Sequence, residues 1–187
     1  MVSMTSPIHL ARAAKALRQG AVVACPTEAV WGLSCDPLNG AAVQRLLQLK
    51  QRDVAKGLIL VAANLDQLGL YIEAPSRKAL LRATATWPGP HTWVFPASPD
   101  APLWVTGGRP SIAVRVSAHE PVAELCRAFG GALVSTSANR SGHPPCMTIA
   151  EIRLRFGPEL IALPGPTGGL TKPTSIREVA TGNILRR

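Results

Sequence analysis

Cysteine and histidine are scarce in this sequence, and neither is spaced to hold a metal or a disulfide framework. The four cysteines, Cys25, Cys35, Cys126 and Cys146, lie far apart, with no CxxC pair and no finger-like histidine spacing. This spacing argues against the common zinc sites and against a disulfide-stapled scaffold. We therefore predict small, buried or half-buried thiols that serve packing.

Long apolar runs and acidic residues are also scarce. No run approaches the roughly 18 apolar residues of a membrane helix, and the N-terminus lacks the layout of a signal peptide. With 47% hydrophobic residues the chain is too apolar for disorder, so we expect a soluble globular protein. Because the signal-peptide layout is lacking, we expect it in the cytoplasm. Twenty basic residues against 11 acidic ones give a net charge of +9. The excess favours phosphate-bearing partners, although an arginine-rich genomic composition explains it equally well.

The familiar catalytic motifs are absent as well. The sequence has no GxGxxG after a first strand, no GxxxxGKS/T loop, no HExxH and no GxSxG. These absences argue against the standard dinucleotide, P-loop, metalloprotease and hydrolase sites. Any chemistry must therefore lie in less common motifs.

Helical and strand patterns alternate along the chain without an internal repeat or linker. Ser6 caps a first helix, Asn39 caps a second, Asn64 opens a short one, and Thr148 begins a capping box. Further helices are expected at 75–87 and 121–129, and strands at 21–25, 58–61, 92–95, 111–116, 132–136, 175–179 and 184–186. The alternation predicts an α/β fold with a twisted mixed parallel/antiparallel sheet flanked by helices, in one domain over 1–187. The run 164–173 is expected to be a mobile loop.

Two polar clusters directly follow predicted strands. Thr27 and Glu28 come after the first strand, where a hydroxyl and free backbone amides could hold a small polar ligand. An ordinary turn explains the same pattern. The stretch 135–141 has five small hydrogen-bonding side chains in seven residues, which suits phosphate, ribose or amino-acid backbone groups. Loops commonly have such compositions too.

A group of cations lies at the end of the second predicted helix. Lys50 falls on the apolar stripe of that helix, and Arg52 and Lys56 follow it closely. A lysine directed into a core is costly unless an anion neutralises it, so the group predicts a polyphosphate site. The alternative is favourable contact of cations with a helix C-terminus, which explains one or two of them.

A further cation, Arg115, closes the predicted strand that begins at Ser111. A guanidinium at a strand end can bind a carboxylate or a phosphate through two parallel hydrogen bonds. A surface ion pair with Glu120 or Glu124 is the competing interpretation.

Five blocks in order resemble the YrdC/TsaC family of threonylcarbamoyl-AMP synthases. They are PTEAVWGLSCDP, LLQLKQR with KGLILVAAN, WPGPHTWVFPA, SIAVRV and LVSTSANRSGHPPC, and the resemblance extends over residues 8–186. It implies an ATP-using nucleotidyltransferase whose sheet carries a deep basic cleft. It also implies one YrdC-like catalytic domain without the additional C-terminal domain of longer members.

The resemblance also implies residue roles. Lys50 and Arg52 would be the catalytic cations, and threonine or its carbamate would be held by Thr27, Arg115 and Ser137. The implied ATP contacts are Arg52, Lys56, Ser111, Asn139, Ser141, Ser175 and Arg177. The sequence differs from the residues most common in the family at Trp31, at Lys56 and in the segment PTSIREV.

The implied reaction joins L-threonine, bicarbonate or CO₂, and ATP into threonylcarbamoyl-adenylate and pyrophosphate, for threonylcarbamoyl-adenosine modification of tRNA. No carboxylate pair for a metal is evident, so Mg²⁺ is expected to arrive on the ATP phosphates. A downstream threonylcarbamoyl-transferase complex would consume the labile product. The alternative is a non-catalytic module that binds double-stranded RNA or tRNA by shape and phosphate contacts, and weak direct tRNA contact stays open for the enzyme too.

Overall fold

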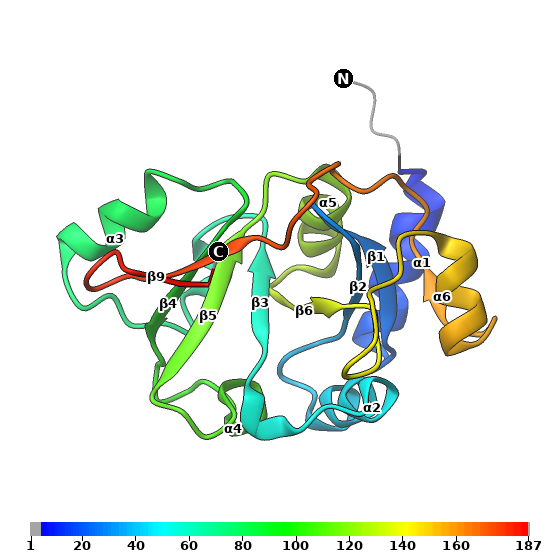
Figure 1. Ribbon diagram of the computed structural model, residues 1–187, viewed down its shortest axis with the longest axis horizontal. Coiled ribbons are helices and arrows are strands. Elements are labelled where there is room, and N and C mark those ends of the chain that lie inside the picture. Colours follow the sequence, from blue (N-terminus) through cyan, green and yellow to red (C-terminus); the bar gives the residue numbers. More distant parts are fainter. Residues whose placement is uncertain (1–4, 187) are drawn as a thin grey trace.

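The computed structural model describes residues 5–186, and nine strands of this part form one mixed sheet (Figure 1). The strand order is β7-β1-β2-β6-β3-β5-β4-β8-β9. The neighbours β1 and β7, β3 and β5, and β4 and β8 are parallel, and the other five pairs are antiparallel. The strands are β1 (Val23–Pro26), β2 (Trp31–Ser34), β3 (Ile59–Ala62), β4 (His91–Pro96), β5 (Ser111–Val116), β6 (Leu133–Ser137), β7 (Ile161–Ala162), β8 (Ser175–Glu178) and β9 (Ile184–Arg186). The predicted mixed α/β sheet is confirmed.

Helices lie on both faces and at both ends of this sheet. In Figure 1, α1 and α6 lie at one end of the molecule and α3 at the other. The α-helices are α1 (Pro7–Arg18), α2 (Gly40–Lys50), α3 (Arg77–Thr84), α4 (Leu103–Thr106), α5 (Glu120–Phe129) and α6 (Ile149–Phe156). Two short 3₁₀ helices are η1 (Val54–Lys56) and η2 (Asp66–Leu68).

Successive residues along β3 belong alternately to two hydrophobic clusters. Leu60 and Ala62 belong to the larger cluster, which includes residues of α2, α3 and α6. Val61 and Ala63 belong to a second cluster with residues of α1 and α5. Because successive strand residues point to opposite faces, the two clusters lie on opposite sides of the sheet. All four cysteines are buried and unpaired, as predicted.

Several elements differ from the prediction. β2, β7 and α4 were not expected. β2 lies between β1 and β6 with all four residues buried, so its sequence shows none of the alternation that marks a half-buried strand. The helix expected at 75–87 is shorter, because Ser76 caps its start and the Thr86 hydroxyl donates to the Ala83 carbonyl just beyond its end.

The run 164–173 has no regular secondary structure, as expected, but its backbone is anchored. Gly168 donates to the Thr27 carbonyl at 3.0 Å, and Leu170 donates to the Glu28 carbonyl at 3.0 Å. A Cβ at Gly168 would lie 2.9 Å from the Glu28 oxygen, so only glycine allows this approach. The loop therefore lies directly on the turn that follows β1; its mobility stays a prediction.

Candidate active site

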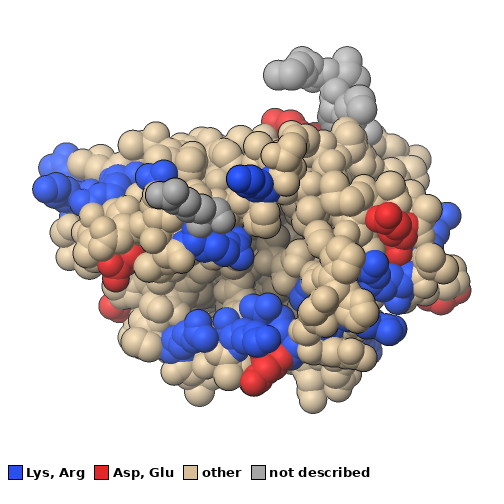
Figure 2. Space-filling view, in the orientation of Figure 1, with Lys and Arg blue, Asp and Glu red and all other residues tan. Residues whose placement is uncertain are grey.

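Two adjoining cavities occupy the middle of one face, where Lys and Arg side chains gather along the rim of a hollow (Figure 2). Each has a volume of about 290 Å³. They share Arg52, Leu58, Ile59 and Arg186, so together they form one cleft. The polar residues that line only the first, the inner cavity, include Thr27, Glu28, Arg115, Ser135, Ser137 and Thr174. Those that line only the second, the outer cavity, include Lys56, Arg109 and Ser111.

Strand periodicity explains how β5 serves both cavities. Ile112, Val114 and Val116 belong to the larger hydrophobic cluster on one face of the sheet. Ser111 and Arg115 therefore lie on the opposite face, four residues apart, and they line the outer and the inner cavity respectively.

The Thr27 turn is the tip of a hairpin that joins β1 and β2. Thr27 donates from both its backbone nitrogen, at 3.0 Å, and its hydroxyl, at 2.7 Å, to the Val30 carbonyl. This double contact closes the turn and fixes Thr27 and Glu28 at the inner cavity. This segment is therefore an ordinary turn and also part of the lining of the inner cavity.

Arg115 lies at the base of the inner cavity, only 5% exposed. Its Nη2 donates to Glu28 Oε2 at 3.1 Å, and Ser117 donates to the other Glu28 oxygen at 2.7 Å. Burial lowers the pKa of Arg115, and the Glu28 carboxylate opposes this shift. The competing expectation of a surface pair with Glu120 or Glu124 is wrong, because Glu120 pairs with Arg127 at 3.6 Å and the partner of Arg115 is 87 positions away.

Arg52 reaches the boundary between the cavities because the chain turns sharply at Gln51. Gln51 has a left-handed backbone with φ of 51°, and it ends α2 with hydrogen bonds from Gln51 and Arg52 back to the last helical turn. Arg52 Nη2 donates to the Gly57 carbonyl at 3.0 Å, while its Nε is buried without a partner. Burial, Arg109 and Arg186 all lower the pKa of Arg52. An unpaired cation beside two others is suited to an anionic ligand.

Lys50 is turned inward, as the apolar stripe predicts, and is only 3% exposed. It is not among the residues that line either cavity. Its ammonium donates to the backbone carbonyls of Ser137 and Asn139 and to the Asn139 side chain. Burial and Arg52 lower the pKa of Lys50 to about 8. Carbonyl oxygens thus take the place of the expected anion, and Lys50 holds the loop that follows β6.

The loop after β6 places Ser137, but not Asn139 or Ser141, at the cleft. The Asn139 side chain accepts from Ser137 at 2.6 Å and from Lys50, and it donates to the carbonyls of Arg140 and His143. These four contacts use its whole hydrogen-bonding capacity. Ser141 is exposed, and its backbone nitrogen donates to the Lys50 carbonyl at 2.8 Å. In this arrangement Asn139 and Ser141 shape the loop, and Ser137, the last residue of β6, lines the inner cavity.

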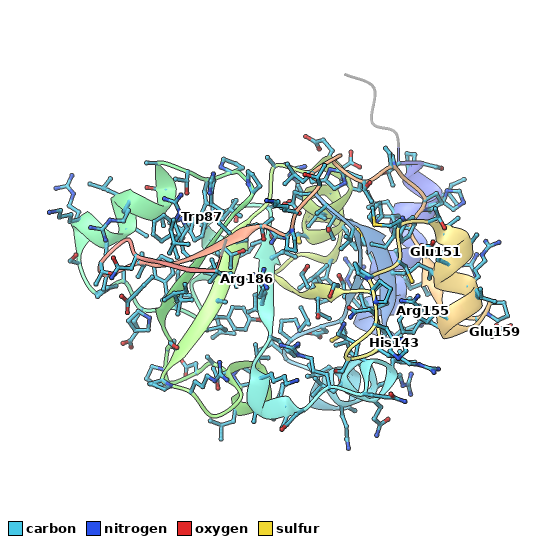
Figure 3. All side chains as sticks on the ribbon, viewed as in Figure 1. Trp87, His143, Glu151, Arg155, Glu159 and Arg186 are labelled. Atoms are coloured by element: carbon cyan, nitrogen blue, oxygen red, sulfur yellow. The ribbon has the colours of Figure 1, made fainter. Side chains whose placement is uncertain are left out.

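The tail contributes to the cleft through residues other than those expected. Ile176 lines the outer cavity, so its neighbours Ser175 and Arg177 lie on the opposite face of β8. Arg177 lies over the Trp93 ring, 5.9 Å from its centroid, and Ser175 faces His91. Instead, Thr174 and Arg186 line the inner cavity, and Figure 3 places Arg186 near the centre of this face.

Sequence reasoning thus did not assign roles to Glu28, Arg109, Thr174 and Arg186, which all line the cleft. The predicted strand 184–186 did place Arg186 on an element, but only the pairing of β9 with β8 brings it over the cavities. Thr174 could be recognised as a residue of the cleft only from its contact with Arg115, 59 positions away.

Carboxylates are nearly absent from this cleft. Glu28 is the one acidic residue among the described residues that line the two cavities, and Arg115 and Ser117 already engage it. Within 5–186, no three His, Cys, Asp or Glu side chains are grouped to hold a metal ion. The donor set of the cleft is therefore suited to anions.

No helix in the described part of the chain is long and apolar enough to cross a membrane.

Known proteins resemble the chain over nearly its whole length. It is 55% identical over 184 residues to the threonylcarbamoyl-AMP synthase of Halorhodospira halophila, covering 98% of this chain and 96% of that protein. The structure of P. abyssi Sua5 complexed with L-threonine superimposes with a TM-score of 0.85 at 31% identity. That match covers 94% of this chain but only 52% of the P. abyssi chain. E. coli YciO shares the fold, with a TM-score of 0.81 at 20% identity over 95% of this chain and 88% of that one.

Residues 15–187 match the Sua5/YciO/YrdC family model, whose description reads "Telomere recombination". Because this match covers most of the chain and agrees with the relatives and the fold, the protein belongs to the Sua5/YciO/YrdC family.

Proposed function

We propose that the protein is a threonylcarbamoyl-AMP synthase, which forms threonylcarbamoyl-adenylate and pyrophosphate from L-threonine, bicarbonate or CO₂, and ATP. The observation that carries the proposal is the division of the cleft. The inner cavity combines a buried arginine with the hydroxyls of Thr27 and Ser137, and the outer one combines Lys56, Arg109 and Ser111. A small zwitterion suits the first and a polyphosphate suits the second. The H. halophila relative is named a threonylcarbamoyl-AMP synthase, which supports the same function. The L-threonine complex of P. abyssi Sua5 supports threonine as a substrate.

The reaction needs no nucleophile from the protein. The neutral threonine amine attacks carbon dioxide, which is supplied directly or by dehydration of bicarbonate, and the nitrogen loses a proton to solvent to give a carbamate. A carbamate oxygen then attacks the α-phosphorus of ATP. The bond from that phosphorus to the bridging oxygen breaks, and pyrophosphate leaves with the electron pair. Holding both substrates side by side and stabilising the charge on the phosphate are sufficient to accelerate such a step.

Arg52 is the residue best suited to act on this step. It lines both cavities, and its buried Nε has no protein partner. A guanidinium at the boundary can contact the carbamate on one side and the phosphate on the other. Arg186 shares the same two cavities and adds a second positive charge there. In this proposal Lys50 acts on the reaction through the Ser137–Asn139 loop.

Mg²⁺ would enter on the ATP phosphates, since Glu28 is the one carboxylate among the described residues that line the cleft. The product is a reactive mixed anhydride, so a threonylcarbamoyl-transferase complex in the cytoplasm would consume it for tRNA modification. The alternative of a non-catalytic RNA-binding module is not favoured, because phosphate contacts with RNA would leave the inner cavity unused.

Pyrophosphate release by the purified protein tests the proposal. We expect release from ATP that requires both L-threonine and bicarbonate, and formation of a threonylcarbamoyl-adenylate detectable by mass spectrometry. D-allo-Threonine, which has the same charges and differs from L-threonine only in the arrangement at Cα, is the matched control substrate. ATP turnover that is indifferent to threonine would overturn the proposal.

A further inference from the structure

Glu28 is a buried carboxylate in a cleft that otherwise favours anions. It is 7% exposed and is the one acidic residue among the described residues that line either cavity. A negative charge here weakens the attraction of the cleft for anionic substrates. Its presence therefore calls for a role that offsets this disadvantage.

Stability alone does not explain the Glu28–Arg115 pair. The two side chains are 9% and 6% exposed, so both charges have lost most of their hydration. A buried ion pair commonly contributes no more stability than apolar side chains of similar volume would, because desolvation offsets the attraction. The pair is instead expected to define the orientation of one of its members.

The contacts of Arg115 show which orientation is fixed. One terminal nitrogen, Nη1, donates to Thr174 at 3.0 Å and to Thr92 at 3.3 Å. The other, Nη2, donates to Glu28 at 3.1 Å. Three of the five guanidinium N–H groups are thereby used, and the buried Nε has no partner. The guanidinium is held from three separate chain segments, and its second Nη2 N–H and its Nε N–H have no protein partner.

Ser117 in turn fixes Glu28. Its hydroxyl donates to Oε1 at 2.7 Å, while Oε2 receives Arg115, so each carboxylate oxygen has a partner. A carboxylate engaged on both oxygens is poorly placed to remove a proton from a substrate amine. It is well placed to hold a guanidinium in one plane.

We propose that Glu28, held by Ser117, is a positioning residue that presents the free donors of Arg115 to the carboxylate of the amino-acid substrate. This inference rests on the proposed function, because it assumes that the inner cavity binds threonine. Glu28 acts through Arg115 and has no direct part in the phosphate chemistry. Its removal is therefore expected to change amino-acid binding and to leave ATP binding nearly unchanged.

Glu28→Gln is the decisive variant, because glutamine keeps the shape of the side chain and removes its charge. We expect the KM for threonine to rise at least about tenfold, with the KM for ATP within about twofold of wild type. Glu120→Gln is the matched control, since it removes the carboxylate of the exposed pair with Arg127. An unchanged threonine KM in Glu28→Gln would overturn the inference.

Inhibition by L-threoninamide separates positioning from a general structural effect. This analogue keeps the threonine side chain and amine but lacks the carboxylate that Arg115 is proposed to bind. Glu28→Gln should therefore weaken inhibition by threoninamide much less than it weakens threonine binding. Equal weakening of both ligands would indicate a distorted cavity and would also overturn the inference.

Ser117→Ala serves as the second variant if Glu28→Gln does not fold. It removes one hydrogen bond to Glu28, so the threonine KM should rise about threefold, again with little change for ATP. If the wild-type protein shows no threonine dependence at all, the proposed function fails and the inference fails with it. If the wild type depends on threonine and neither variant shifts its KM, the inference alone fails.

Discussion

Arg115 and Arg52 line the same inner cavity, but their surroundings differ. Arg115 is paired with a carboxylate and held by two threonine hydroxyls, whereas Arg52 is tethered to one backbone carbonyl and lies near two other arginines. A paired cation is fixed in orientation and keeps little net charge, which suits recognition of a small molecule by shape. An unpaired cation among like charges carries excess potential, which suits a ligand with several negative charges.

The outer cavity extends this contrast. Lys56 and Arg109 are exposed there, and neither forms an ion pair within residues 5–186. Repulsion among Arg52, Arg109 and Arg186 disfavours the cluster until a polyanion binds. The protein thus stores unfavourable charge where the polyphosphate is expected and neutralises charge where the amino acid is expected.

The largest effect is expected from Arg52→Ala, which removes the cation shared by both cavities. Turnover should fall by at least about 100-fold, because the charge at the reacting phosphate is lost. The melting temperature should stay unchanged or rise, since a half-buried cation with like-charged neighbours is removed. Steady-state pyrophosphate release and differential scanning fluorimetry measure the two quantities.

Arg45→Ala, at an exposed arginine on α2, is the control for that experiment. It should leave turnover near wild type. A marked fall in the melting temperature of Arg52→Ala would mean that Arg52 supports the fold, and the contrast with Arg115 would be lost.

A smaller effect is expected from Lys56→Ala, which tests the outer cavity alone. The KM for ATP should rise about fivefold, as expected for an exposed charge contact, while the KM for threonine should not change. The ATP KM of the variant should also depend less on sodium chloride, because one screened interaction is missing. A change in the threonine KM instead would show that the two cavities are not separate in function.

The smallest effect concerns Lys50, a cation whose partners are neutral carbonyls. Its pKa of about 8 in the folded protein lies below the ordinary value of 10.5. Between these pH values the unfolded chain binds the proton more strongly, so the contribution of Lys50 to folding stability increases as pH rises. The melting temperature of wild type relative to Lys50→Met should therefore shift by a few degrees in favour of wild type from pH 7 to 10.

Lys78→Met, at an exposed site on α3, provides the comparison for Lys50. Its difference from wild type should stay nearly constant over the same pH range. If the Lys50→Met difference is equally constant, the pKa of Lys50 is the same in the folded and unfolded states, and the carbonyls fully offset its lost hydration.

Local sequence patterns predicted those features that depend on a single element. The apolar stripe of α2 predicted the inward direction of Lys50, and the predicted strand 111–116 placed Ser111 and Arg115 on one element, which lines both cavities. The turn after β1 was predicted as a loop with Thr27 and Glu28, and it lies at the inner cavity. In each case neighbouring residues in the chain determine where the side chain points.

Features that depend on contacts between distant segments could not be predicted in this way. Nothing near Arg115 in the sequence indicates Glu28 as its partner, and Glu120 and Glu124 were closer candidates. The expected tail contacts Ser175 and Arg177 required knowing which face of β8 meets the cleft, which is set by its pairing with β4. Family resemblance supplied threonine, bicarbonate and tRNA, which no side-chain pattern specifies.

The contacts of Arg115 also bear on how the protein unfolds. They join the first hairpin, 87 positions before it, to the tail, 59 positions after it. The inner cavity therefore exists only when three remote segments have assembled, and it disappears if any one of them detaches. A ligand bound there resists separation of all three, so its binding energy protects the whole chain against cooperative unfolding rather than one local region.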